Sequence, residues 1–354
     1  MPVAEGAPMG KAWAQEATAF SAAEKHGIRL DRGDIDRAER RLAGRIWRTP
    51  VVRSEHLDAL AGARLWLKAE NLQRGGSFKV RGALLAVEQL AAAGSRGVIA
   101  QSTGNHAIAV SLAAREYRLP ATLVLPSDAA PVKIQRIRET GAEVVLSGTV
   151  LADRVAMVEK LRDVHGYDVV DPYENPHVVA GQGTATAELL GETAAKGVPL
   201  DAVVVPIGGG SAIAGACLAA RGYEVAVVGA EPAAVPAFTA ALRERQPVTV
   251  VTGHTIADGL RPERIGALPF GLARGSVAEV VTVQEAAIAE ALRAALLDAR
   301  LVIEPAAATA LAAALSHAAG FGTDVGVLLS GGNVEPGLVA SLLTGHADEG
   351  RRVP

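Results

Sequence analysis

Short apolar runs alternate with segments of helical periodicity along most of the chain. A first series predicts strands at 97–100, 121–126, 142–147 and 167–171, with helices at about 105–117, 131–140 and 151–165. A second series begins with the apolar run 201–210 and predicts further strands at 224–232, 277–283 and 325–332, with helices at 212–220, 285–298 and 305–317. Short apolar strands that alternate with helices favour parallel sheets joined by right-handed crossovers.

The pattern therefore predicts an α/β protein of two open, twisted parallel-sheet domains with a cleft between them. Ligands bind such folds at the carboxyl ends of the strands. The Ala-rich, polar segment 1–32 predicts a loosely attached arm. A helical stretch then begins, with Asp34 as the expected N-cap, and ends before Pro50.

Composition narrows the class of protein. The 354 residues are 49% apolar and 21% charged, which is typical of a globular fold. The net charge of -3 gives no reason to expect a nucleic acid or an anionic membrane as partner. The lone cysteine, Cys217, excludes an internal disulfide and is expected in the core. With neither a membrane-length apolar stretch nor a signal-like N-terminus, the sequence predicts a cytoplasmic enzyme or binding protein.

Four turns rich in glycine and polar residues follow strands or flank helices, where a ligand would bind. They are "GGSFKVRGA" (75–83), "QSTGNHA" (101–107), "IGGGSAIAG" (207–215) and "SGGN" (330–333). The first holds Lys79 among small residues, and burial there would lower the pKa of its amine and make it a nucleophile. The second and third open helices, so their backbone N–H groups suit a carboxylate or a phosphate.

The glycine loop taken alone leaves two ligands open. Gly208, Gly210 and Gly215, followed by Glu231, also fit a dinucleotide, although the spacing departs from the usual fingerprint. Taken together, the four turns supply what pyridoxal 5'-phosphate needs: an amine for a Schiff base, a phosphate cradle, an anion-binding helix start and a hydroxyl for the pyridine nitrogen.

Most of the chain resembles a known family of enzymes. From about residue 33 to 345 it is similar to the serine/threonine dehydratase branch of the fold type II pyridoxal-phosphate enzymes, which have the tryptophan-synthase-β-like architecture. The matching segments keep the family's order, and they are "KAENLQRGGSFKVRGA" (68–83), "STGNHA" (102–107), "AGQGTATAE" (180–188), "PIGGGSAIAG" (206–215), "GAEP" (229–232), "TIADGL" (255–260), "EPAAA" (304–308) and "SGGN" (330–333).

The resemblance implies a role for each matching residue. Lys79 would carry the cofactor as a Schiff base and act as the base at Cα. The other cofactor-binding residues would be Phe78 beside the ring, Asn105 at its phenolic oxygen, Ser330 at its nitrogen, and Gly208, Gly209, Gly210 and Ser211 around the phosphate. The substrate carboxylate would be received by Ser102, Thr103, Gly104 and His106, and Glu304 is a further candidate near the pyridine edge.

The resemblance also implies a domain plan. A large cofactor-binding domain would comprise 33–97 and 174–345, a small mobile domain 98–173 and a tail 346–354, with no room for a C-terminal regulatory domain. Members of the family are commonly homodimers or homotetramers. The implied activity is α,β-elimination from a β-hydroxy amino acid, with L-threonine or L-serine expected first. The alternatives are a serine racemase, a 3-hydroxyaspartate dehydratase and a β-replacement synthase on the same cofactor.

Three positions depart from the family's pattern. Ser211 replaces the fourth glycine of the loop, which leaves backbone phosphate binding intact. Glu231 stands where metal-activated members hold a divalent cation, but Ala237 replaces their second acid, so no metal site is expected. Thr103 stands where racemases have serine and many threonine dehydratases have alanine, and the dehydratase remains the favoured activity.

Overall fold

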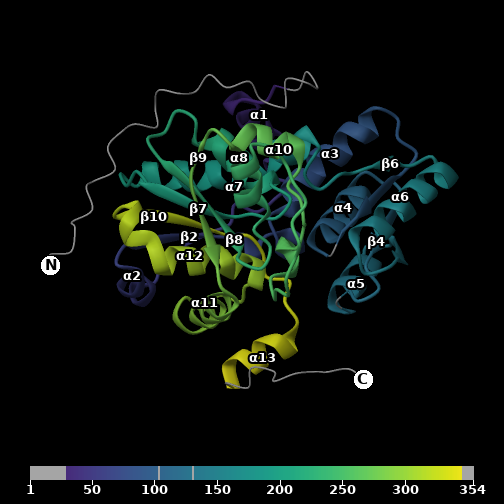
Figure 1. Ribbon diagram of the computed structural model, residues 1–354. Coiled ribbons are helices and arrows are strands. Elements are labelled where there is room, and N and C mark those ends of the chain that lie inside the picture. The colour runs from purple at the N-terminus through teal and green to yellow at the C-terminus, as the bar shows by residue number, and fades with distance from the viewer. Residues whose placement is uncertain (1–28, 103, 130, 345–354) are drawn as a thin grey trace, which may run out of the picture.

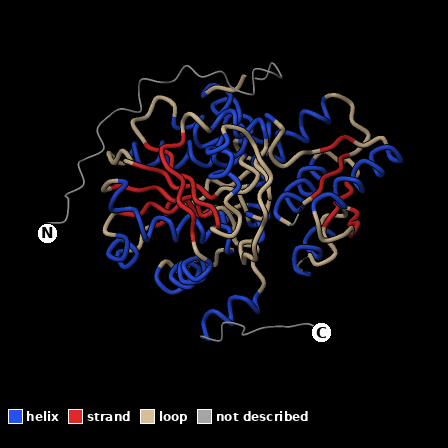
Figure 2. Tube along the Cα trace, in the orientation of Figure 1, coloured by secondary structure: helices blue, strands red, loops and turns tan. Residues whose placement is uncertain are grey.

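The strands form two separate sheets (Figures 1 and 2). The computed structural model describes residues 29–102, 104–129 and 131–344. Most of the expected arm (1–32), the tail (346–354) and Thr103 lie outside the described residues. Among the described helices, none combines the length and apolar character that a bilayer-spanning segment needs.

The larger sheet has six strands in the order β1-β2-β10-β7-β8-β9. Only β1 and β2 pair antiparallel, and the other neighbours are parallel. Its strands are β1 (Val51–Val52), β2 (Arg64–Ala69), β7 (Ala202–Pro206), β8 (Ala226–Pro232), β9 (Val277–Val283) and β10 (Asp324–Leu329). The smaller, parallel sheet has the order β5-β4-β3-β6, with β3 (Val98–Gln101), β4 (Ala121–Leu125), β5 (Glu143–Leu146) and β6 (Asp168–Val169). The predicted parallel α/β class is confirmed.

Helices cover both sheets. The N-terminal half contributes α1 (Arg32–Leu42), α2 (Glu55–Ala61), α3 (Lys79–Ala92), α4 (Asn105–Glu116), α5 (Pro131–Arg138) and α6 (Leu151–His165). The C-terminal half contributes α7 (Pro176–Ala195), α8 (Ser211–Ala220), α9 (Ala237–Glu244), α10 (Ala267–Ala273), α11 (Glu285–Asp298), α12 (Pro305–Phe321) and α13 (Pro336–Thr344). Short 3-10 turns are η3 (Glu70–Leu72), η4 (Arg74–Gly76) and η5 (Asp258–Leu260).

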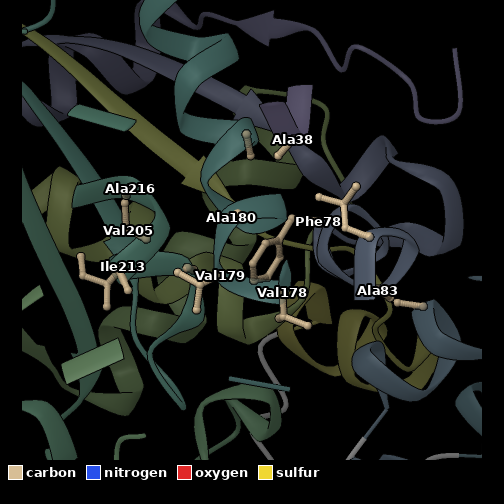
Figure 3. Close-up of a cluster of buried hydrophobic side chains, with 14 of the residues drawn as sticks. Ala38, Phe78, Ala83, Val178, Val179, Ala180, Val205, Ile213 and Ala216 are labelled. Carbon is tan, nitrogen blue, oxygen red and sulfur yellow. The ribbon is translucent and has the colours of Figure 1, made fainter. Parts of the chain in front are cut away.

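The larger sheet buries both of its faces. Successive strand side chains point to opposite faces, so Val203 and Val205 of β7 join one core and Ala202 and Val204 the other. The first core holds buried residues of α1, α3, α7 and α8, several of which gather around Phe78 in Figure 3. The second holds residues of α2, α11 and α12. Cys217 of α8 is buried in the first core, as predicted.

The two sheets share a core rather than meeting only at a hinge. Val98 and Ala100 of β3 belong to the same cluster as the first face of the larger sheet. Ile99, between them in sequence, faces the other way and packs with Val158 of α6. Helices α3 and α4 complete the shared cluster, so the segments that begin these helices are fixed relative to each other.

Helix α7 lies between α3 and α8 and approaches both through glycines. A Cβ on Gly181 would stand 2.5 Å from the Cα of Gly82 in α3. A Cβ on Gly183 would stand 2.6 Å from the carbonyl oxygen of Gly215 in α8. These contacts bring backbone against backbone, so the positions of α3 and α8 are set by the same helix.

The structure corrects several boundaries. The N-cap of α1 is Asp31, whose carboxylate accepts from the N–H of Asp34, so Asp34 lies inside the helix and completes a capping box. The helix ends at Leu42, well before Pro50, and Gly44 then adopts a positive φ of 74°. The segment 51–69, for which no element was predicted, forms β1, α2 and β2.

Candidate active site

Lys79 is the first residue of α3 and faces a cavity of about 220 Å³. Its Nζ lies 3.5 Å from the Ser211 hydroxyl and 5.0 Å from the centre of the Phe78 ring. Burial of the ammonium group lowers the pKa of Lys79 from 10.5 to about 8, although the charges of Glu304 and Asp171 oppose this shift. The amine is therefore partly neutral at neutral pH, as the sequence predicted.

The lysine segment is joined to the turn that follows β10. The N–H of Phe78 donates to the carbonyl of Ser330 at 3.0 Å, and the N–H of Gly332 donates to the carbonyl of Gly76 at 2.9 Å. Gly76 adopts a φ of 73°, and a Cβ there would stand 2.4 Å from Oδ1 of Asn333. Two turns far apart in the sequence are thus fixed side by side.

The glycine loop connects β7 to α8. Gly210 is the N-cap of α8 with a φ of 104°, and Ser211 is its first residue. A Cβ on Gly209 would stand 2.1 Å from the ring of Tyr173, and a Cβ on Gly210 would stand 2.8 Å from Pro269. Only bare backbone fits here, and the first N–H groups of α8 have no partner within the helix.

The segment 102–106 connects β3 to α4. The N–H of Gly104 donates to the Ser102 hydroxyl at 2.9 Å, so the N–H groups of Asn105 and His106 are the ones that the helix start offers to a ligand. The buried imidazole of His106 lies with Nε2 2.9 Å from the carbonyl of Val170. Burial and the charge of Lys79 lower its pKa to about 3, so the ring is neutral at ordinary pH.

A chain of amides leads from the turn after β10 to Glu304. Asn333 donates from Nδ2 to the carbonyl of Gly75 at 2.8 Å and to Oδ1 of Asn105 at 2.9 Å. Asn105 in turn donates to Oε1 of Glu304 at 2.5 Å. Burial raises the pKa of Glu304 to about 7, and its Oε2 has no hydrogen-bond partner within the described residues.

The structure brings nearly all of the predicted residues to one cavity. Its lining includes Phe78, Lys79, Ser102, Asn105, His106, Gly208, Gly209, Gly210, Ser211, Glu304 and Ser330. The predicted residue Gly104 is not among the lining residues, and a Cβ there would stand 2.2 Å from the side chain of Lys133.

The dinucleotide alternative does not fit. Gly215 faces Gly183 of α7 and serves helix packing. The carboxylate of Glu231 accepts from the N–H groups of Phe238 and Thr239, at 2.9 Å each, and so holds the start of α9. Both residues that would have completed a dinucleotide site are therefore occupied by structural contacts. Among the described residues, no group of three or more His, Cys, Asp or Glu side chains is arranged to hold a metal ion.

Several residues of the site were not predicted. Lys133 of α5 forms an ion pair of 2.5 Å with Asp258 of η5, and Arg154, Tyr173 and Arg261 line the cavity. Gly259, which belongs to the matching segment 255–260, also lines the cavity. No local signal marks these residues, because Arg154 directly follows Asp153 and Arg261 lies between Asp258 and Glu263, as in ordinary surface segments of mixed charge.

Arg81, two residues after Lys79, belongs to a buried cluster of charged side chains. The buried guanidinium pairs with Glu70 at 2.7 Å and with Glu188 at 2.8 Å. Lys68, also fully buried, pairs with Glu188 at 2.7 Å. This cluster fixes the first turn of α3 directly behind Lys79.

The donor set fits pyridoxal phosphate. A helix start preceded by a loop where a Cβ on Gly209 or Gly210 would collide suits a phosphate, and an amine of lowered pKa suits an aldehyde carbon. Glu304 lines the cavity, and its buried Oε2 has no hydrogen-bond partner within the described residues. This fold and this site define an enzyme that uses a phosphorylated aldehyde cofactor in a cleft between two parallel sheets.

Comparison with known proteins gives the family. The model of the family described as pyridoxal-phosphate dependent enzyme matches residues 42–331. An L-threo-3-hydroxyaspartate ammonia-lyase from Pseudomonas sp is 40% identical over 316 residues, which cover 88% of this chain and 98% of that protein. A serine racemase from Oryza sativa subsp. indica is 34% identical and covers 90% of this chain and 95% of that protein.

A solved structure supports the same assignment. The crystal structure of the T.th. threonine deaminase has 39% sequence identity and a TM-score of 0.82, over 86% of this chain and 99% of that one. The chain belongs to the pyridoxal-phosphate dependent enzymes of fold type II, and its cofactor is pyridoxal phosphate.

Proposed function

We propose that this enzyme is a carbon–nitrogen lyase that converts a β-hydroxy α-amino acid into a 2-oxo acid and ammonia. The observation that carries the proposal is the Lys79 amine, which has a pKa of about 8 and lies 3.5 Å from Ser211 at the start of α8. The names of the similar ammonia-lyase and deaminase support the reaction type.

In this proposal the large sheet supplies the cofactor site. Lys79 would bind the carbonyl carbon of the cofactor, and Gly208, Gly209, Gly210 and Ser211 would bind its phosphate through backbone N–H groups. Phe78 would lie beside the ring, Asn105 would donate to its phenolic oxygen and Ser330 would donate to its nitrogen. When bound, pyridoxal phosphate supplies an electron sink that acidifies the Cα–H bond of an attached amino acid.

The chain's own groups then bind the substrate and move its proton. The N–H groups of Asn105 and His106 at the start of α4 bind the α-carboxylate, where the helix dipole favours an anion. Nζ of Lys79, once free, takes the proton from Cα, which its lowered pKa suits. The neutral imidazole of His106 holds this helix start against the carbonyl of Val170 and carries no proton in the reaction.

The substituent on Cβ separates the candidate substrates. It is hydrogen in L-serine, methyl in L-threonine and carboxylate in 3-hydroxyaspartate. Racemisation of serine and replacement at Cβ are the other outcomes that the same Cα proton transfer permits. The racemase depends on an acid or base at Thr103, which lies outside the described residues.

The test is turnover by the purified holoenzyme. L-Serine, L-threonine and 3-hydroxyaspartate are supplied separately, and ammonia, 2-oxo acid and D-amino acid are measured. We expect ammonia and 2-oxo acid in equal amounts, abolished in Lys79→Ala and retained in Lys160→Ala, which changes an exposed lysine of α6. Release of neither product from any β-hydroxy amino acid, or D-serine as the main product, would refute the lyase.

A further inference from the structure

Two arginines from different parts of the fold line the cavity. Arg154 lies in the first turn of α6, which packs on the smaller sheet. Arg261 directly follows η5 in the larger domain. No contact in the proposed cofactor or α-carboxylate site uses either guanidinium, so their presence calls for a separate explanation.

Arg154 is buried without a counterion. It is only 6% exposed, and its Nη1 donates to the carbonyls of Thr149 at 3.1 Å and Val150 at 3.2 Å. Its Nε is buried and has no hydrogen-bond partner within the described residues. Among those residues, neither Arg154 nor Arg261 forms an ion pair. A buried cation without an anion is unfavourable unless a ligand supplies one.

The charges around Arg154 also favour the binding of an anion. Burial and the positive charge of Arg261 lower the pKa of Arg154, while Asp128, Tyr173 and Asp153 oppose the shift from beyond pairing distance. Glu263 also lines the cavity, but it is exposed and pairs with neither arginine. An anion between the two guanidinium groups would relieve their repulsion and satisfy Nε, and a carboxylate matches their planar donors.

We propose that Arg154 and Arg261 bind a second carboxylate, carried on Cβ of the substrate, so that the enzyme acts on a dicarboxylic β-hydroxy amino acid such as 3-hydroxyaspartate. This inference rests on the lyase function proposed above, in which the start of α4 already takes the α-carboxylate. A methyl or hydrogen on Cβ would leave both guanidinium groups without an anion.

The reaction balances without an external oxidant. In 3-hydroxyaspartate the Cα–H and Cβ–O bonds break, and the hydroxyl leaves as water with a proton. The resulting enamine takes a proton at Cβ, forming a new Cβ–H bond, and becomes an imine. Water then replaces the nitrogen at Cα, and the products are oxaloacetate and ammonia. Cα is oxidised and Cβ is reduced within the same molecule.

The first test compares substrates in the holoenzyme and four variants. Arg154→Gln and Arg261→Gln are expected to lower kcat/KM for 3-hydroxyaspartate roughly 10- to 100-fold, because each removes a charge-assisted hydrogen bond to the carboxylate. The values for L-serine and L-threonine should change far less. The controls are Arg162→Gln on the same helix and Arg264→Gln in the same loop, both exposed and outside the cavity lining.

A uniform loss for all three substrates would overturn the inference, because it would mean that Arg154 only holds residues 149–150 in place. Since Arg261 is exposed, its variant keeps the test valid if Arg154→Gln fails to fold. Good turnover of L-threonine with none of 3-hydroxyaspartate would also overturn the inference and would leave the lyase function intact.

The second test measures binding without turnover. Succinate has two carboxylates and butyrate has one on the same number of carbons, and neither has an amine that can react. Calorimetric titration of the holoenzyme should show succinate binding at least about 10-fold more tightly than butyrate, with the difference lost in Arg154→Gln. Equal binding of the two acids would refute the second carboxylate site even if no amino acid is turned over.

Discussion

Replacing Gly215 by alanine tests whether α7 sets the position of the glycine loop. A Cβ at this position would stand 2.5 Å from the N atom and 2.7 Å from the Cα of Gly183, and 2.7 Å from the carbonyl oxygen of Val179. All three atoms belong to the backbone of α7. No side chain can rotate away, so the two helices must separate.

The size of the effect follows from these distances. Ordinary van der Waals contact begins at 3.4 Å, so α8 must move by roughly 1 Å at this point. Overpacking of this kind costs about 1–3 kcal/mol of folding stability. Gly210 and Ser211, one turn earlier on the same helix, would move with it. A displacement of this size at a binding group can cost up to about 100-fold, and we expect the affinity for pyridoxal phosphate to fall accordingly.

The assay is a titration of the apoenzyme with pyridoxal phosphate, followed by absorbance, together with urea unfolding. The matched control is Gly191→Ala in α7, where a new Cβ meets nothing within 4 Å. Alanine should raise helix stability there by about 0.5–1 kcal/mol and leave cofactor affinity unchanged. Wild-type affinity in Gly215→Ala would refute the argument that the α7–α8 contact positions the phosphate site.

Two further predictions concern charge. Because Lys79 must be neutral to attack the cofactor and its pKa is about 8, the rate constant of cofactor uptake by the apoenzyme should rise about tenfold per pH unit below pH 8 and level off above it. A rate that still climbs at pH 10 would contradict the lowered pKa. Arg81→Met leaves the buried carboxylates of Glu70 and Glu188 without their main partner and should cost about 3–5 kcal/mol in urea unfolding, with Arg81→Lys less severe. An unchanged unfolding free energy in Arg81→Met would show that the cluster adds nothing to stability.

The parts of the site that could be predicted from the sequence are the turns that follow strands. The glycine loop follows β7, the segment 102–106 follows β3 and the turn 330–333 follows β10. Each reads as glycine and polar residues after an apolar run. Parallel sheets place such turns at their carboxyl edges, so the sequence predicted a shared site.

Strand β2 was not predicted because a buried charge interrupts its apolar pattern. Lys68 lies in β2 with no exposed surface, which apolar periodicity cannot anticipate. Its partner Glu188 is 120 residues away. Arg81 pairs with Glu70, 11 residues away, and also with Glu188, 107 residues away. The longer-range pairing is set by the fold and leaves no local signature.

The cofactor-binding part of the site and the part that lies on the smaller sheet are positioned by different kinds of contact. This difference affects how readily substrate specificity can change. Lys79 and the glycine loop start helices that dock on α7 through backbone contacts, which tolerate almost no substitution. Arg154 and Lys133 instead come from helices of the smaller sheet and reach the cavity through long side chains. Side chains can be exchanged without moving the backbone. Relatives at 34–40% identity can therefore share a cofactor site yet bear different substrate names, and the groups facing Cβ are where those differences should be sought.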